Sequence, residues 1–220
     1  MLPGTLAVRE FNLLRIVSDG INYGCGLSLA GLALSYFFNP FLGIPLYLAA
    51  LFCLWFFRDP ERKIPAGDVM VSPADGKVLG IREISGGDRR LSIFLNIFNV
   101  HVTRCPIGGR IDEITYTKGK FHVASLESAS TENEKSTIRI DAGGRPVVFS
   151  LIAGLIARRI VCYKQPGDIV ATGDRAGLMK FGSRVDVLVG PSWEIVVKDG
   201  QKVSAGSTVI ARPARQQEMV

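Results

Sequence analysis

The pair Gly182-Ser183, within residues 179–186, combines two residue types that together could break their own peptide bond. Glycine has no side chain to shield its carbonyl carbon, and the hydroxyl of the next serine lies close to that carbon. Attack by Ser183 on Gly182 would convert the amide into an ester. Elimination and hydrolysis would then leave a ketone, a pyruvoyl group, on a new N-terminus. This ketone is an electrophile that no ordinary side chain supplies.

Other candidate reactive residues are ambiguous when each is taken alone. Most Gly-Ser pairs form ordinary turns, and a second one occurs at Gly206-Ser207. Asp75 precedes a glycine, and Asp-Gly is among the commonest hairpin turns. His101 is one of two histidines; imidazole can take a serine proton near neutral pH, although a lone histidine is more often structural.

Several arginines could bind an oxyanion. A guanidinium group pairs with a phosphate or a carboxylate through two parallel hydrogen bonds. Most surface arginines are simply solvated, so the sequence predicts only a set of candidates. They are Arg104, Arg158, Arg159 and Arg184.

The stretch from residue 21 to residue 57 contains no charged side chain. Asn39-Pro40, a turn signal, divides it into apolar segments 21–38 and 41–57. Each is near the lower limit of about 17–25 residues for a membrane-spanning helix. We predict that residues 1–63 anchor the chain to a membrane through a helical hairpin. A hairpin that only dips into one leaflet and a buried hairpin in a soluble core remain alternatives.

Basic residues flank the apolar stretch on both sides. Arg9 and Arg15 precede it, and Arg58, Arg62 and Lys63 follow it. This distribution places both ends of the hairpin in the cytoplasm. A cleaved signal peptide fits poorly, because the apolar region is too long and begins too late.

The formal net charge of +6 favours an anionic partner. With a membrane anchor, anionic lipid is a simpler partner than nucleic acid, and no basic block interleaved with aromatic residues occurs. The four cysteines show no spacing typical of a metal site. We therefore expect reduced thiols, no metal and no nucleic-acid partner.

Residues 64–220 form a second domain that reads as mainly β. Short runs rich in β-branched residues alternate with glycine-containing turns. Turns followed by strands recur near residues 66–78, 166–174 and 199–206, as in barrel-sandwich-hybrid folds, including cofactor-carrier domains. Residues 125–135 read as a surface loop or short helix. The expected strands are 69–71, 76–83, 91–95, 100–104, 109–117, 136–140, 147–152, 159–161, 176–181, 184–189 and 203–211.

The chain resembles the phosphatidylserine decarboxylase proenzyme family, in the short form of many bacteria and archaea. Six motifs in order, after an apolar hairpin, carry this resemblance. They are FRDP at 57–60, SPADGKV at 72–78, FNVHVTR at 98–104, KGKF at 118–121, ARRI at 157–160 and FGSRVD at 181–186.

The resemblance implies a role for each part of the reactive pair. Ser183 would attack Gly182 and divide the chain into a β subunit, 1–182, and an α subunit, 183–220. The former Ser183 would become a covalent pyruvoyl cofactor that forms a Schiff base with the serine amine of the lipid head group. Carbon dioxide would leave, and phosphatidylethanolamine would be released.

By resemblance, Asp75 and His101 join Ser183 as catalytic residues in a Ser-His-Asp arrangement. Long-form relatives carry two histidines three apart before a proline, whereas this chain has His101 and Arg104 before Pro106. Either His101 performs both proton transfers, or water or another group performs one. We expect His122 to be structural or peripheral.

The function predicted is decarboxylation of phosphatidylserine at the cell membrane, with the catalytic domain on the cytoplasmic side. The two fragments would stay together as a heterodimer, which could assemble further. An archaetidylserine-type decarboxylase is one alternative. A non-catalytic membrane-tethered adaptor or carrier module is another, and it would leave Asp75, His101 and the FGSRVD motif unexplained.

Overall fold

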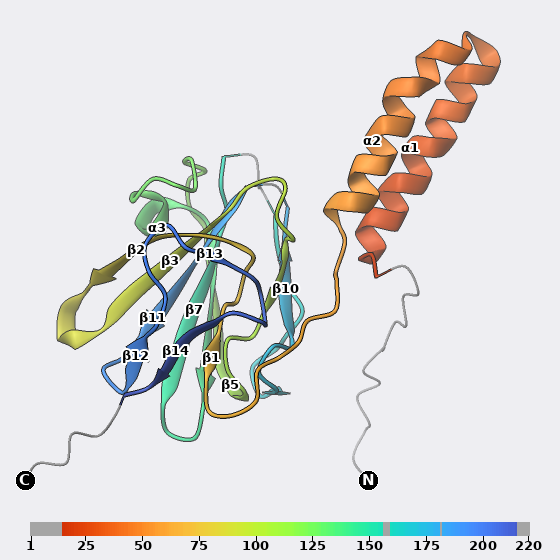
Figure 1. Cartoon of the computed structure of the whole chain (residues 1–220). Coiled ribbons are helices and arrows are strands. Elements are labelled where there is room, and N and C mark those ends of the chain that lie inside the picture. Colours follow the sequence, from red (N-terminus) through yellow and green to blue (C-terminus); the bar gives the residue numbers. More distant parts are fainter. Residues whose placement is uncertain (1–14, 156–158, 181, 215–220) are drawn as a thin grey trace, which may run out of the picture. The chain divides into compact units, whose positions relative to one another are not determined.

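The computed structural model describes residues 15–155, 159–180 and 182–214 (Figure 1). Two compact units make up the chain, Met1–Glu61 and Arg62–Val220. The first is helical and the second is mainly β, so the expected fold class is confirmed at that level. Arg9, Arg158 and Phe181, which the sequence analysis singled out, lie outside the described residues.

The first unit is a helical hairpin. Helix α1 (Ser18–Phe37) is followed by a 3₁₀ turn, η1 (Pro40–Gly43), and by helix α2 (Ile44–Phe56). The side-chain oxygen of Asn39 accepts a hydrogen bond of 2.9 Å from the backbone N–H of Phe41 and begins the turn. A Cβ atom on Gly31 would lie 2.9 Å from the Tyr47 ring, so glycine allows the helices to approach closely.

Among the helices of the described residues, none is both long enough and apolar enough to cross a membrane. The prediction of two membrane-crossing helices is therefore not confirmed, although both predicted helices exist. Large apolar side chains are nevertheless exposed along the hairpin. They include Leu29, Leu32, Tyr36, Phe37, Phe41, Leu48 and Leu51.

The second unit is built on a curled antiparallel sheet of eight strands (Figure 1). Their order across the sheet is β13-β2-β3-β11-β7-β6-β5-β9. In that order their bounds are Lys202–Val203, Gly76–Glu83, Arg89–Leu95, Ser183–Val189, Pro146–Ile152, Lys135–Asp141, Gly109–Thr117 and Ile169–Val170.

Two sheets of three strands complete this unit. One has the order β1 (Met70–Val71), β14 (Val209–Pro213) and β12 (Trp193–Ile195). The other has the order β4 (Val102–Arg104), β10 (Arg175–Met179) and β8 (Ile160–Cys162). Short helix α3 (Ala129–Glu132) and 3₁₀ turn η2 (Ser85–Gly87) lie in connections.

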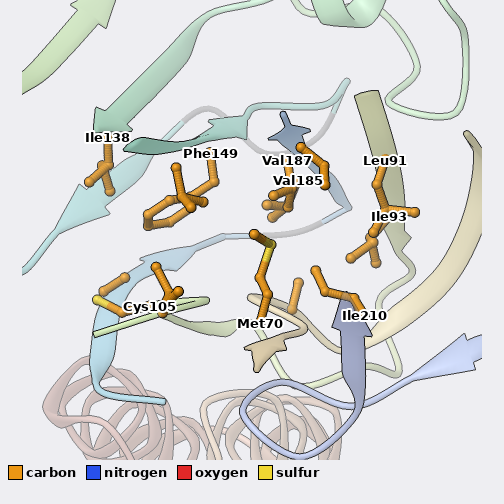
Figure 2. Packing of buried hydrophobic residues seen from close by; sticks show 14 of the residues in the cluster. Met70, Leu91, Ile93, Cys105, Ile138, Phe149, Val185, Val187 and Ile210 are labelled. Atoms are coloured by element: carbon orange, nitrogen blue, oxygen red, sulfur yellow. The ribbon is translucent and has the colours of Figure 1, made fainter. Parts of the chain in front are cut away.

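The core lies between the large sheet and the smaller ones. Along β3, β11 and β7, alternate residues point to it, as the period of two requires. Figure 2 shows Leu91, Ile93 and Val185 of the large sheet facing Met70 and Ile210 of β1 and β14. All five side chains are fully buried. Burial of each contributes about 1.5–3 kcal/mol and holds the sheets together.

The prediction of one continuous strand over residues 203–211 is wrong for residues 204–208. The chain forms β13 and β14 instead, separated by a turn in which the N–H groups of Ser207 and Thr208 donate to the carbonyl of Ser204. Gly206 adopts φ +73°, a left-handed conformation that interrupts a strand. Strand β12 was not expected, whereas the predicted bounds of β2 and β5 are correct.

Candidate active site around Ser183

The Gly182-Ser183 bond lies where the chain passes from one sheet to another. Strand β10 ends at Met179 in a three-stranded sheet, and β11 begins at Ser183 in the eight-stranded sheet. Ser183 is opposite Leu95 of β3, and the next residue is also paired with β7. Gly182 has φ +60°, which a side chain would disfavour. Strands therefore fix the reactive bond on both sides.

Gly154 makes room for the carbonyl that would be attacked. A Cβ atom on Gly154 would overlap the carbonyl oxygen of Gly182 and lie 3.1 Å from the Cβ of Ala124. The backbone at residue 154 thus packs directly against the scissile carbonyl. Sequence reasoning did not find this residue, because the close approach joins positions that are far apart in the chain.

The hydroxyl of Ser183 is buried and available. The residue has 0 % of its surface exposed, and its Oγ has no hydrogen-bond partner among the described residues. A buried unsatisfied hydroxyl costs roughly 1–3 kcal/mol and is uncommon outside functional sites. The side chain shares a face with Val185, so it points toward the core side of the sheet.

His101 is placed next to the strand that leads into the reactive bond. Its backbone carbonyl accepts a hydrogen bond of 3.1 Å from the N–H of Met179, at the end of β10. The ring is fully buried, and Nδ1 lies 3.0 Å from the carbonyl oxygen of Asn99. A carbonyl can only accept, so Nδ1 carries the proton. In the neutral ring Nε2 then holds the lone pair that a base requires.

Asp75 lies at the same end of the large sheet as Ser183. It directly precedes β2, and β3 separates β2 from β11. Two strand spacings amount to about 10 Å. One carboxylate oxygen accepts from the N–H of Ala205 at 2.8 Å and the other from the guanidinium of Arg62 at 2.9 Å. In the intact chain, the carboxylate thus binds Arg62 and Ala205 rather than His101.

The candidate arginines differ in their surroundings. Arg104 is buried and donates to the carbonyl of Gly173 at 3.0 Å. Arg159 is exposed, and its backbone carbonyl accepts from the N–H of Lys180. Arg158 lies outside the described residues. Arg159 therefore has a side chain that a ligand could reach without rearrangement of the core.

Arg184 is buried on the face of β11 opposite to Ser183. Its guanidinium donates to Asp186 at 2.7 Å, to the hydroxyl of Ser92 at 2.6 Å and to the carbonyl of Leu126 at 3.1 Å. Only 1 % of the residue is exposed. These contacts tie β11 to β3 and to the segment before α3. As a head-group ligand, Arg184 would first have to lose some of them.

A cavity of about 400 Å³ lies beside Arg184. Its lining includes residues of β2, β3 and β11, and Ser183 is not among them. Because Arg184 and Ser183 alternate along β11, this cavity belongs to the other face of the sheet. Its polar lining consists of Arg82, Ser92, Ser125, Glu127, Arg184 and Asp199.

His122 takes part in an exposed cluster with Lys120 and Glu132. Its Nε2 lies 3.2 Å from the carboxylate of Glu132, which also binds the ammonium group of Lys120 at 2.9 Å. The hydrogen bond from Lys120, and then that from His122, lower the pKa of Glu132. The expectation that His122 is structural or peripheral stays a prediction.

The surroundings of Ser183 fit the formation of a pyruvoyl group from this residue. The hydroxyl is not held by another polar group among the described residues, and the preceding glycine is in a left-handed conformation. Gly154 leaves space for the scissile carbonyl. A nucleophile, a carbonyl carbon on a residue without a side chain and a buried imidazole near the same strand end are the components that self-cleavage requires.

Comparison with known proteins places this chain among related sequences. A family model described as phosphatidylserine decarboxylase matches residues 49–211. The phosphatidylserine decarboxylase proenzyme of Solibacter usitatus is 57 % identical over 199 residues, covering 90 % of this chain and 97 % of the relative. That of Rickettsia akari is 42 % identical over 217 residues, covering 93 % and 94 %. That of Desulfotalea psychrophila is 44 % identical over 173 residues, covering 75 % and 81 %. The chain belongs to the phosphatidylserine decarboxylase family.

Proposed function

We propose that this protein cleaves itself at Gly182–Ser183 and then decarboxylates phosphatidylserine to phosphatidylethanolamine. The observation that carries the proposal is the buried, available hydroxyl of Ser183 directly after Gly182. Relatives of this family are named proenzymes, which agrees with an activity that requires processing. The protein is accordingly a carboxy-lyase.

We propose that the self-cleavage proceeds in three steps. Ser183 Oγ bonds to the carbonyl carbon of Gly182, the C–N bond breaks, and the hydroxyl proton passes to the freed amine. The proton on Cα of residue 183 is then removed and the Cβ–Oγ bond breaks, so that the Gly182 carboxylate leaves and a double bond forms between Cα and Cβ. Cβ finally takes up a proton and becomes a methyl group as the enamine converts to an imine, and water replaces the imine nitrogen, which departs as ammonia. The products are fragments 1–182 and 183–220, and the latter begins with a pyruvoyl group.

A pyruvoyl ketone supplies an electrophile for the amine of the head group and an electron sink for loss of carbon dioxide. This chain's own residues would exclude water and move protons around that group. His101 is the residue we place in that role, because its Nδ1 is held by Asn99 and its Nε2 can accept or donate a proton. Asp75 is proposed to act in self-cleavage at the same sheet end.

Arginines remain the proposed ligands of the head-group phosphate and carboxylate. Arg159 is supported by its exposure and by its contact with Lys180, three residues before Ser183. Arg104 and Arg158 remain candidates from the sequence. Arg184 is the weakest of the four, since three protein groups already occupy its donors.

We also propose that the hairpin associates with a membrane and leaves the β domain on the cytoplasmic side. Its exposed apolar side chains support this proposal, as do the basic residues that follow it. The domains would divide near residue 63, and the β domain would be related to barrel-sandwich hybrids. The two fragments would remain a heterodimer, which could form a larger oligomer.

The intact mass of the purified protein, beside that of a Ser183→Ala variant, tests the proposal. We expect two fragments that divide at residues 182 and 183, with the small one lighter than a serine N-terminus allows, and an uncut variant. Incubation with phosphatidylserine vesicles should then release carbon dioxide from the processed protein alone. A folded wild-type chain that stays full-length would favour a non-catalytic adaptor module instead. Cleavage without turnover of diacyl phosphatidylserine would favour the archaetidylserine-type alternative, a lipid with ether-linked tails and the same serine head group.

A further inference from the structure

The segment that follows the hairpin is tightly held by the β domain. A Cβ atom on Gly173 would overlap Ile64, and one on Gly206 would lie 3.0 Å from Ile64 and 3.5 Å from the Cβ of Arg62. Both glycines have left-handed φ angles, +83° and +73°. Residues 62–64 therefore pack against two glycine turns that leave no space for side chains.

This packing delivers the Arg62 guanidinium to Asp75. The Nη2 atom lies 2.9 Å from Oδ2, and the two side chains are only 13 % and 15 % exposed. An ion pair so poorly hydrated depends on both partners, because removal of the cation leaves a carboxylate that lacks compensation. The pair is unlike the exposed ion pair of Arg110 and Asp112, whose side chains are 63 % and 29 % exposed.

Two donors from different parts of the chain fix the orientation of the Asp75 carboxylate. Arg62 binds one oxygen, and the backbone N–H of Ala205 binds the other at 2.8 Å. Arg104, which occupies the position of the second histidine of long-form relatives, packs at the same turn: a Cβ on Gly206 would lie 2.9 Å from its Cδ. Arg62 thus binds the Asp75 carboxylate directly, and Arg104 packs against the turn that supplies its second donor.

We propose that Arg62 is a positioning residue for self-cleavage, which holds the Asp75 carboxylate in a fixed orientation at the Ser183 end of the sheet. The inference rests on the proposed function, in which Asp75 acts in processing. Arg62 comes six residues after the last residue of α2. The chain segment that leaves the hairpin is thus part of the processing machinery, not only a connection.

Self-cleavage of the full chain made in a cell-free system, followed over time by gel and by intact mass, tests this proposal. We expect Arg62→Ala to slow cleavage at least tenfold and Arg62→Lys to slow it less, because an ammonium keeps the charge but not the planar fork. Added ethylguanidinium should restore much of the rate in Arg62→Ala, whereas ethylurea, of similar shape but neutral, should not. Arg110→Ala serves as the matched control and should cleave like the wild type.

Several outcomes would overturn the proposal. The proposal is rejected if a folded Arg62→Ala chain cleaves at the wild-type rate. It is also rejected if this chain cleaves faster, which would mean that Arg62 restrains Asp75. A purely structural role would be indicated if Arg62→Lys cleaves as slowly as Arg62→Ala and if added ethylguanidinium does not raise the rate of Arg62→Ala. Thermal melting in a Ser183→Ala background checks each fold; if Arg62→Ala is unfolded, Arg62→Lys decides, and a wild-type rate there rejects the proposal. Failure of the wild type itself to cleave would instead reject the proposed function.

Discussion

Gly154 and the carbonyl oxygen of Gly182 are in contact so close that no Cβ atom fits between them. A side chain at residue 154 would push the scissile carbonyl away from its position beside Ser183. We expect Gly154→Ala to slow self-cleavage at least tenfold, seen as uncut chain in a cell-free time course. Gly80→Ala is the control, since its Cβ would meet nothing closer than 4.0 Å and its φ is ordinary. Equal rates for the two variants would show that the carbonyl can move freely.

The buried pair of Arg184 and Asp186 should matter for stability more than for head-group affinity. The guanidinium donates to Asp186 at 2.7 Å, and the carboxylate also accepts from Ser130 at 2.6 Å. Removing one partner of such a pair costs about 3–5 kcal/mol. We expect Arg184→Met to lower the free energy of unfolding by this amount in urea, measured in a Ser183→Ala background. Unchanged stability with a raised KM in processed enzyme would instead support a direct role in substrate binding.

Arg159 should show the reverse behaviour, because its side chain is exposed. Arg159→Ala is expected to leave the urea transition unchanged within about 0.5 kcal/mol, as is usual for surface sites. If the guanidinium binds the phosphate, KM for phosphatidylserine vesicles should rise about tenfold with little change in kcat. Arg212→Ala, at an exposed position of β14, provides a charge-matched control. A KM that does not change would remove Arg159 from the set of head-group ligands.

The Lys120, Glu132 and His122 cluster should respond to acid. Hydrogen bonds from Lys120, and then from His122, hold the pKa of Glu132 below its ordinary value of 4.5. The stabilising contribution is therefore present above that ordinary value and is lost as pH falls through the lowered pKa. We expect an NMR titration of Glu132 with a midpoint below 4.5, and Lys120→Met should move the midpoint upward. A midpoint unaffected by this substitution would show that the contact is not formed in solution.

A chain beginning at Arg62 should fold without the hairpin. The described core residues of the β domain lie between Met70 and Ala211, so burial does not depend on the helices. We expect this shortened protein to cleave itself, because Arg62, Asp75 and Ser183 are all retained. Its binding to anionic vesicles, measured by flotation, should be much weaker than that of the full chain. Vesicle binding of equal strength would assign membrane association to the β domain itself.

The sequence predicted the strands whose apolar residues alternate without interruption. Strands β2 and β5 have the expected bounds, and β3 and β7 differ from them by at most two residues. The prediction of a strand over residues 203–211 was wrong because apolar residues lie on both sides of Gly206, whereas the backbone turns at this glycine. Periodicity reports which residues are apolar, but a left-handed glycine within the run changes the path of the chain.

The components of the site were predicted as residue types, but their contacts were not. Ser183, His101 and Asp75 were recognised from local motifs, and the structure places them near one end of the β domain. From the sequence, Arg62 is only one of the positive charges that follow the hairpin, and no pattern indicates a role for Gly154. Both contact residues that are not their neighbours in sequence, and spacing along the chain contains no information about such packing.

Strand β11, between β3 and β7 in the middle of the large sheet, gives the proposed cut an additional consequence. Fragment 183–220 would contain this strand together with β12, β13 and β14, while fragment 1–182 keeps both partners of β11, the partner of β13 and one of the two partners of β14. The two products would be interwoven and could not part without melting the sheet. After dilution, the processed protein should therefore come apart no faster than it unfolds, and the rate at which its fragments exchange should equal its rate of unfolding.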